Sequence, residues 1–381
     1  METPIRLSAF KAGHFDTGYG YKSFVPSLIN RRWELDVPAV INLLSQADRK
    51  LGELNAFSQL VPDVDFFIRM HVTKEATTSS RIEGTQTNIE EALIKVEDID
   101  PERRDDWEEV QNYIQSIKYS MDQLSQLPIS TRLILATHGI LLQGVRGQHK
   151  RPGEYRNSQN WLGASLKDAL FIPPHHDHLN RLMSDLEQFL HNQALEIPHL
   201  IRIALIHYQF ETIHPFLDGN GRLGRLLITL YLVSNGLLTK PTLYLSDFFE
   251  RNRIHYYDNL HRVRTHNDLT QWLKFFLTGV IETAESSIDT FKGIIDLRHR
   301  VEFGLLPQLG KRAENALRLM HILYQQPVVT ARNIEQELNI DASTVGRLLT
   351  QFTRLNILQE VTGFKRNRLF YFTEYLSLFH K

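Results

Sequence analysis

Residues 214–225, with the sequence HPFLDGNGRLGR, constrain the fold of this chain more than any other stretch. Apolar residues recur at helical spacing before them, over 197–213, and again after Gly221 as far as Asn235. The three glycines between these two patterns allow backbone N–H groups to turn toward one point without side chains in the way. The chain must therefore bring two helices together at a tight, glycine-rich turn.

The polar residues of this turn point to a phosphate site. The second helix is predicted to begin near Asn220, where its unpaired N–H groups and its dipole favour an anion. Arg222 and Arg225 are three residues apart and share one helical face, so two guanidinium groups would lie beside that anion. Asp218 can hold Mg²⁺ through its oxygens, and His214 can take a proton from a hydroxyl nucleophile.

A simpler interpretation is an interhelical turn with surface arginines and an N-capping aspartate. It accounts for each feature taken singly. It does not account for five polar groups within one short span, because packing requires no such combination. The stretch therefore predicts nucleotide binding together with a general base.

Helical periodicity dominates the rest of the chain and predicts a mainly α fold. Between the helices, residues 147–178 contain glycine, proline and short β-prone pieces, which predict a long loop with one hairpin at most. Helices are predicted over 37–54, 64–81, 108–124, 130–143, 179–193, 197–213, 221–235, 246–263 and 269–278, with a further long helix to about Arg300.

Composition excludes several classes of protein. The formal net charge is −1, so the whole molecule has no bulk attraction for nucleic acid or for anionic lipid. The chain has no cysteine, which suits a reducing compartment, and its start lacks the layout of a signal peptide. The most apolar run, near Leu226–Val233, is too short to cross a bilayer. We expect a cytoplasmic protein with no membrane partner.

The C-terminal region, residues 311–381, has a different character. Three predicted helices are followed by a hairpin of ILQEV and RLFYF, which is typical of a winged helix-turn-helix domain. Ten Lys and Arg against six Asp and Glu give this region a positive charge that fits a phosphate-facing surface. Winged helices also dock proteins, so both DNA and a protein partner stay open.

HPFLDGNGRLGR resembles the signature of the Fic (Fido) family at every fixed position. The resemblance implies a Fic-type helical bundle with a β-hairpin flap, and a protein adenylyltransferase that moves AMP from ATP onto a Ser, Thr or Tyr hydroxyl of a target protein. It implies that His214 deprotonates that hydroxyl and that Asp218 positions Mg²⁺ between the α- and β-phosphates. The implied nucleotide contacts are Gly219, Asn220 and Gly221 as the anion hole, Arg222 on the phosphates, Arg225 on the γ-phosphate, and the intervening Leu223 and Gly224.

The stretch SSRIEGT at 79–85 resembles the inhibitory motif of the same family, with Ser79, Glu83 and Gly84 in place. By this resemblance the inhibitory helix covers about 64–84, and Glu83 pairs with Arg225 and thereby excludes the γ-phosphate. The alternative is a helix end capped by glycine, with Glu83 merely solvated.

Other segments extend the resemblance. ALFIPPHHDHL resembles the flap that aligns a target segment by strand addition, and PGEYR at 152–156 is similar to the stretch upstream of it. SDFFERNRIHYYDNL resembles the helix beside the adenine, where Asn252, Tyr256 and Tyr257 would line the pocket, although aromatic residues at helical positions are mostly core. We expect no metal at His175–His178, because adjacent histidines cannot all converge on one ion.

The predicted domains are an N-terminal region over 1–125, a Fic catalytic domain over 126–300 and a winged helix-turn-helix domain over 311–381. This order is similar to a bacterial subgroup of the family, and a homodimer stays open. Two other functions are considered: removal of AMP from a modified target, with Glu83 orienting a water, and a DNA-binding regulator that uses the site as a nucleotide sensor. Kinase chemistry is disfavoured, because the chain has no GxxxxGK[ST] loop.

Overall fold

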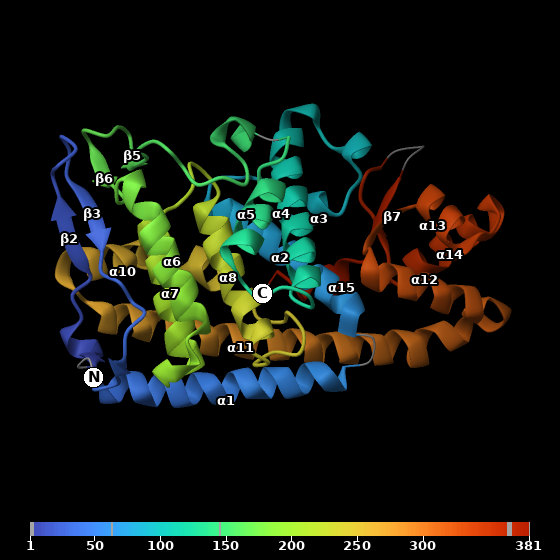
Figure 1. Cartoon of the computed structure of the whole chain (residues 1–381). Coiled ribbons are helices and arrows are strands. Elements are labelled where there is room, and N and C mark those ends of the chain that lie inside the picture. The colour runs from blue at the N-terminus through green and yellow to red at the C-terminus, as the bar shows by residue number, and fades with distance from the viewer. Residues whose placement is uncertain (1–3, 62–63, 145, 364–367, 381) are drawn as a thin grey trace.

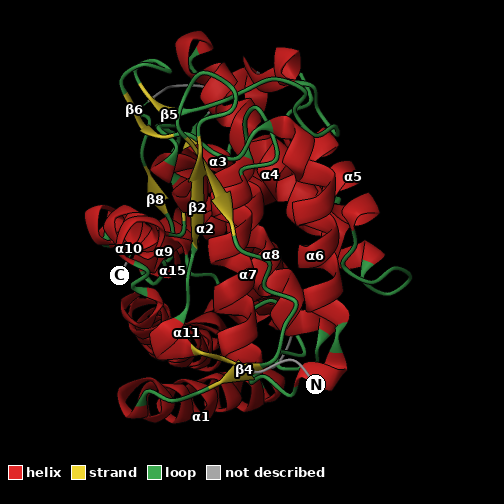
Figure 2. Cartoon of the chain, turned by 60° about the vertical axis from the view of Figure 1, so that its left-hand side comes forward, coloured by secondary structure: helices red, strands yellow, loops and turns green. Residues whose placement is uncertain are grey.

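A computed structural model describes residues 4–61, 64–144, 146–363 and 368–380. Helices make up most of it, as the red ribbons of Figure 2 show. The long helices α1 (Pro38–Leu60) and α11 (Leu269–His299) pack along one another at the base of the molecule (Figure 1). The mainly α prediction is confirmed.

The centre of the bundle is formed by α7 (His199–Ile213) and α8 (Asn220–Ser234). Every residue of α7 after His199 is buried, and such all-round burial is typical of a helix enclosed by others. The surrounding helices are α2 (Val64–Ile82), α3 (Ile89–Ala92), α4 (Arg104–Gln123), α5 (Thr131–Leu141) and α6 (Leu179–His191). The turn that joins α7 to α8 is thus fixed by a rigid core on both sides.

Two predicted helix boundaries are wrong. The helix predicted over 246–263 is two helices, α9 (Ser246–Arg251) and α10 (Arg253–His266), because Asn252 leaves helical geometry at φ −110° and ψ 33°. The break predicted near residue 278 does not exist, since α11 is continuous over 31 residues. Burial of its apolar stripe, from Leu269 to Leu297, holds the whole length against the bundle.

Short strands form at two places in the first half of the fold. The N-terminal stretch, for which the sequence predicted no strand, contains β1 (Ile5–Arg6) paired with β4 (Trp33–Glu34), and a hairpin of β2 (Gly13–Asp16) and β3 (Ser23–Pro26). The predicted loop over 147–178 contains the hairpin of β5 (Leu162–Gly163) and β6 (Ala169–Phe171). Figure 1 shows β2 and β3 beside β5 and β6 at one end of the molecule. We call β5 and β6 the flap.

The C-terminal region contains α12 (Ala313–Gln325), α13 (Ala331–Leu338), α14 (Ala342–Arg354) and α15 (Thr373–Ser377). Its three-stranded sheet has the order β7 (Val328–Thr330), β9 (Leu369–Tyr371) and β8 (Gln359–Glu360). This order of elements agrees with the predicted winged helix-turn-helix, whose assignment stays a prediction. Phe67 of α2 packs on Tyr324 and Tyr375, so the region shares a core with the bundle.

Within the described ranges, no helix combines the length and the apolar character that a membrane crossing requires.

Candidate active site

The turn between α7 and α8 is held in shape by its own side chains and backbone. His214 ends α7 in the left-handed region, at φ 49° and ψ 61°, and Gly219 begins α8 at φ 76°. Asn220 clamps the loop between them: its Oδ1 accepts the N–H of Phe216 at 2.9 Å and its Nδ2 donates to Phe216 O at 2.9 Å. The N–H groups at the start of α8 are therefore presented in a fixed direction.

His214 is oriented as a base. Its Nδ1 lies 3.4 Å from Glu211 O, which assigns the proton to Nδ1 and leaves Nε2 with a lone pair. Burial, together with the charge of Arg156, lowers the pKa of His214 to about 4. The imidazole is therefore neutral near pH 7 and able to accept a proton.

Arg156, which the sequence placed only within PGEYR, fixes the backbone around His214. It is buried, and its Nε–H donates to His214 O at 2.9 Å while its backbone N–H donates to Pro215 O at 2.9 Å. Its Nη2 also donates to Pro174 O at 2.5 Å, beside the flap. One guanidinium thus joins the loop after α7 to the segment that follows the flap, a role for which a single sequence gives no signal.

His138 of α5 was not predicted and supports the loop from the other side. Its Nε2 lies 3.0 Å from Asp218 O, and its Nδ1 accepts the N–H of Gly153 at 2.9 Å. The ring stacks on Phe216 at a centroid distance of 3.7 Å. Burial lowers the pKa of His138 to about 4, so this histidine is neutral near pH 7. Its role is structural: it holds the loop in place.

Arg222 is buried with spare hydrogen-bonding capacity. Its side chain is 4% exposed and lies 3.5 Å from Glu109 Oε2 and 3.7 Å from Asp218 Oδ1. Its Nε and Nη1 have no hydrogen-bond partner among the described residues. Buried donors are normally satisfied, so these two N–H groups agree with the predicted phosphate contact of Arg222, which stays a prediction.

Arg225 is held by the C-terminal end of α2. Its Nη2 donates to Glu83 Oε1 at 2.8 Å and to Ser79 O at 2.9 Å, and its Nε donates to Ser79 Oγ at 2.8 Å. Burial alone would raise the pKa of Glu83, but the guanidinium outweighs burial and lowers it. The structure thus brings together Ser79, Glu83 and Arg225, three residues that the sequence had linked.

Gly221 allows Glu83 to approach the start of α8 closely. A Cβ on Gly221 would lie 2.2 Å from Glu83 Oε1 and 2.9 Å from Arg225 Nη1. Gly84, which follows Glu83, has φ +106° and ends the helix in a conformation that favours glycine. Glu83 therefore lies against the start of α8, where an anion would bind. Gly224 lies equally close to Glu211, and Leu223 is buried in the core.

Asp218 presents one partly exposed carboxylate at the start of α8. Its side chain is 45% exposed, and only Oδ1 is engaged within the loop, by the N–H of Gly219 at 2.6 Å. Mg²⁺ is commonly held by one or two carboxylates together with substrate phosphates. The residue thus fits the predicted metal, with the phosphate-facing helix start beside it.

The residues predicted beside the adenine lie in different surroundings. Tyr256 is buried, and its hydroxyl lies 2.8 Å from His207 Nε2 in the core. Tyr257 is 40% exposed, and Asn252 donates from Nδ2 to Phe248 O at 3.0 Å. Contact of these three residues with adenine stays a prediction.

The histidine run at the flap converges more than expected. One ligand atom from each of His175, His176 and Asp177 lies within 4.8 Å of the others, so adjacent histidines do approach one point here. His178 instead faces Asp16 at 3.8 Å. Tyr19 stacks on His175 at 3.6 Å and covers one side of the cluster. Two of the three histidines thus approach one another with Asp177 while His178 does not, and the expectation that no metal binds here stays a prediction.

Two family models match this chain: Fic/DOC family N-terminal over residues 41–122 and Fic/DOC family over 128–232. The chain therefore belongs to the Fic/DOC family. The Protein adenylyltransferase Fic of Aedes aegypti is 30% identical over 36% of this chain and 25% of its own length. The protein of the same name from Drosophila mojavensis is 26% identical over 70% of this chain and 50% of its own length. The chain thus spans a quarter to a half of the length of these curated relatives.

Solved structures extend the likeness of fold to most of the chain. A Fic family protein from Desulfovibrio desulfuricans G20 aligns with a TM-score of 0.55 and 21% identity, over 90% of this chain and 98% of that chain. Fic-1 (residues 134–508) from C. elegans aligns with a TM-score of 0.51 and 21% identity, over 68% of this chain and 73% of that chain. The Fic-type fold predicted from the sequence is confirmed.

Proposed function

We propose that this chain is a protein adenylyltransferase that transfers AMP from ATP to a Ser, Thr or Tyr hydroxyl of a target protein, itself included, and that Glu83 inhibits it. The observation that carries this proposal is the pairing of Glu83 with Arg225 at the start of α8, opposite a neutral His214. Family membership and relatives named as adenylyltransferases support the reaction class.

The transfer needs few groups. His214 Nε2 accepts the proton of the target hydroxyl, whose oxygen attacks the α-phosphorus of ATP. The bond from that phosphorus to the oxygen bridging to the β-phosphate breaks, and pyrophosphate leaves. The N–H groups at the start of α8 and the buried Arg222 face the phosphates and stabilise their charge. Asp218 would hold Mg²⁺, which neutralises phosphate charge when it is bound.

Inhibition follows from competition for one guanidinium. Arg225 is 2% exposed, and its Nη2 and Nε donate to Ser79 and Glu83. A γ-phosphate that requires the same guanidinium must displace Glu83, whose own side chain is 37% exposed and can move toward solvent. ATP bound without that contact is not aligned for attack, which keeps basal activity low.

The flap supplies a surface for the target. Leu170 of β6 is 80% exposed, and Trp161 and Leu162 beside it are 41% and 37% exposed. Exposed apolar side chains on a short hairpin are typical of strand addition with side-chain pockets. We propose that the segment carrying the hydroxyl docks here. Arg156 connects the flap to His214, so docking and the base share one support.

The test is transfer of label from ATP marked on the α-phosphate, with γ-labelled ATP as control. We would compare wild type, Glu83→Gly and His214→Ala, each with and without lysate as a source of target. We expect strong α-label on protein for Glu83→Gly, little for wild type and none for His214→Ala. Equal labelling of wild type and Glu83→Gly would show that Glu83 does not inhibit the transfer.

If no variant takes up α-label, transfer itself is wrong. Removal of AMP is then the alternative within the same site. It would be measured as release of AMP from a target that another enzyme has already modified.

A second role is proposed for the C-terminal region. Arg347 and Arg354 of α14 are both exposed and lie seven residues apart, so they share one face of the predicted recognition helix. We expect binding to duplex DNA that weakens as salt rises and is lost when Arg347 and Lys365 are replaced together. Lys365 lies outside the described residues. Binding without a salt dependence would favour a protein partner.

A further inference from the structure

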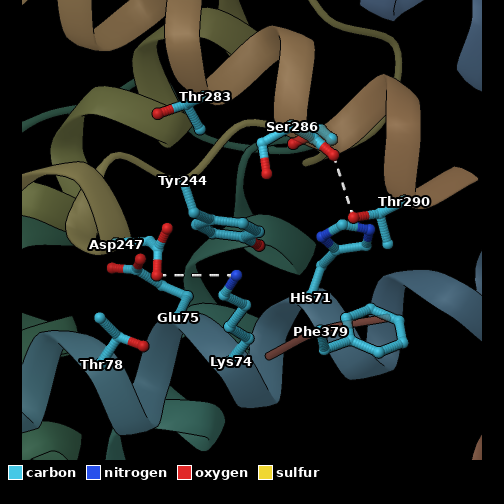
Figure 3. A pocket seen from close by; sticks show the side chains of 11 residues that line it. His71, Lys74, Glu75, Thr78, Tyr244, Asp247, Thr283, Ser286, Thr290 and Phe379 are labelled. Carbon is cyan, nitrogen blue, oxygen red and sulfur yellow. Dashed lines mark hydrogen bonds and ion pairs between the residues drawn. The ribbon is translucent and has the colours of Figure 1, made fainter. Parts of the chain in front are cut away.

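A small cavity lined largely by polar residues lies on α2 at His71, Lys74, Glu75 and Thr78 (Figure 3). Side chains from α2, from the start of α9 and from α11 line it, and Phe379 of the C-terminal segment lies beside them. The cavity therefore lies where the inhibitory helix meets the elements that hold it in place.

Four polar atoms of the lining have no hydrogen-bond partner within the described protein: His71 Nε2, Glu75 Oε2, Tyr244 OH and Thr283 Oγ1. Each of these side chains is at least nine-tenths buried, with exposed fractions of 7%, 3%, 8% and 8%. Buried polar groups without partners are costly and rare, and four in one cavity indicate a ligand that satisfies them together.

The size of the cavity limits the ligand. Its volume is about 30 Å³, and one water molecule needs about 10–15 Å³ measured in this way. We infer that this cavity binds about two ordered water molecules, which bridge Glu75 of α2 to Tyr244 and Thr283 and so fix the inhibitory helix on α9 and α11. The water is a structural ligand of the inhibited state.

The same carboxylate leads to the phosphate side of α2. Glu75 Oε1 accepts from Ser246 Oγ at 2.6 Å and from Tyr113 OH at 3.1 Å. The Tyr113 hydroxyl also lies 2.9 Å from Arg222 O and 3.5 Å from Ser79 Oγ. Ser79 Oγ in turn accepts from Arg225 Nε. When water fixes the Glu75 carboxylate, that carboxylate holds Tyr113 in place, and Tyr113 in turn holds Ser79. Ser79 is then positioned, together with Glu83, to accept hydrogen bonds from Arg225.

The first test is thermal unfolding of Thr283→Val. This change keeps the volume and removes one bonding partner of the water, so we expect the Tm to fall by about 1–3 °C. Thr290→Val is the matched control on the same helix and the same cavity, because its hydroxyl already donates to Ser286 O at 3.0 Å. An unchanged or raised Tm for Thr283→Val shows a dry cavity and overturns the inference.

Glu75→Gln separates water from a bound cation. An amide keeps one acceptor for Ser246 and Tyr113 and still bonds to water, so we expect it to match wild type in Tm. A bound cation would require the negative charge of the carboxylate. A clear fall in Tm with Glu75→Gln would therefore mean that the cavity binds a monovalent cation and not water.

The inference that the water in the cavity supports inhibition by Glu83 rests on the proposed function, and it is tested by a separate measurement. We expect Thr283→Val to raise α-label incorporation several-fold over wild type, with no further rise in the Glu83→Gly background. If Thr283→Val lowers the Tm but leaves α-label incorporation unchanged, the water site stands and its role in inhibition is wrong. If Glu83→Gly takes up no label, the proposed function has failed, and the Tm comparison still decides the cavity.

Discussion

At the scale of single residues, burial sets the protonation state of the site. His214 and His138 lie on either side of the loop, and burial lowers the pKa of each to about 4. Both are neutral at pH 7, yet only His214 keeps a free ring nitrogen, because His138 uses both of its nitrogens within the loop. The two histidines therefore differ in the ring nitrogens that the loop already engages.

We expect His214 in the nucleotide-free protein to gain a proton only below about pH 5, since its pKa is about 4. The measurement is a titration of histidine ring carbons by NMR, with His214→Ala identifying the signal. A midpoint near the ordinary value of about 6.5 would show that the ring is solvated. In that case the neutral base would have to be created by ATP binding.

At the scale of elements, α2 connects the start of α8 to the helices packed around it. This helix packs on α4, α8, α9 and α12. Ser79 in its last turn and Glu83 just after its end both accept hydrogen bonds from Arg225. Because these contacts share one rigid helix, a change anywhere along α2 reaches Arg225.

Ser79→Ala tests how much of the proposed inhibition depends on the Ser79 hydroxyl and how much on Glu83. The variant loses the bond from Arg225 Nε to Ser79 Oγ, while Ser79 O and Glu83 still accept from Nη2. We expect α-label incorporation between that of wild type and that of Glu83→Gly. A level equal to Glu83→Gly would mean that Ser79 alone positions the pair; Ser80→Ala, on the same turn and buried, is the control.

At the scale of the whole molecule, buried titratable groups make stability depend on pH. Burial lowers the pKa of His71 and His207 to about 3 and of His138 and His214 to about 4. The contribution of these four histidines to the free energy of unfolding is fully present above pH 6.5, the approximate pKa of histidine in the unfolded chain. It is lost as the pH falls toward their pKa values in the folded protein. Burial raises the pKa of Glu75 and Glu211 to about 7, and the contribution of these carboxyls is lost as the pH rises toward 7.

The four histidines outweigh the two glutamates between pH 4.5 and 6.5. Near pH 5.5 the unfolded chain binds roughly two more protons than the folded one, so the free energy of unfolding should rise by about 2.5 kcal/mol per pH unit there, and by less toward pH 6.5. Urea unfolding at a series of pH values measures this slope. A flat or falling free energy over this range would show that the histidines are hydrated in the folded protein.

The sequence by itself determined the fold class, most of the helices and the residues of the loop from His214 to Arg225. Local chemistry sufficed, because apolar periodicity predicts helices and the spacing of glycine, arginine and histidine follows one short segment. It also linked Glu83 to Arg225, although only by resemblance, since 142 residues separate them.

Only the tertiary structure decided which side chains support that loop. Arg156 and His138 come from other parts of the chain, and their roles depend on carbonyl groups that the fold brings within reach. The break at Asn252 and the unbroken α11 were likewise set by packing, which overrides weak local preferences. The cavity behind α2 is the clearest case, because its polar atoms meet only when three elements close on one another.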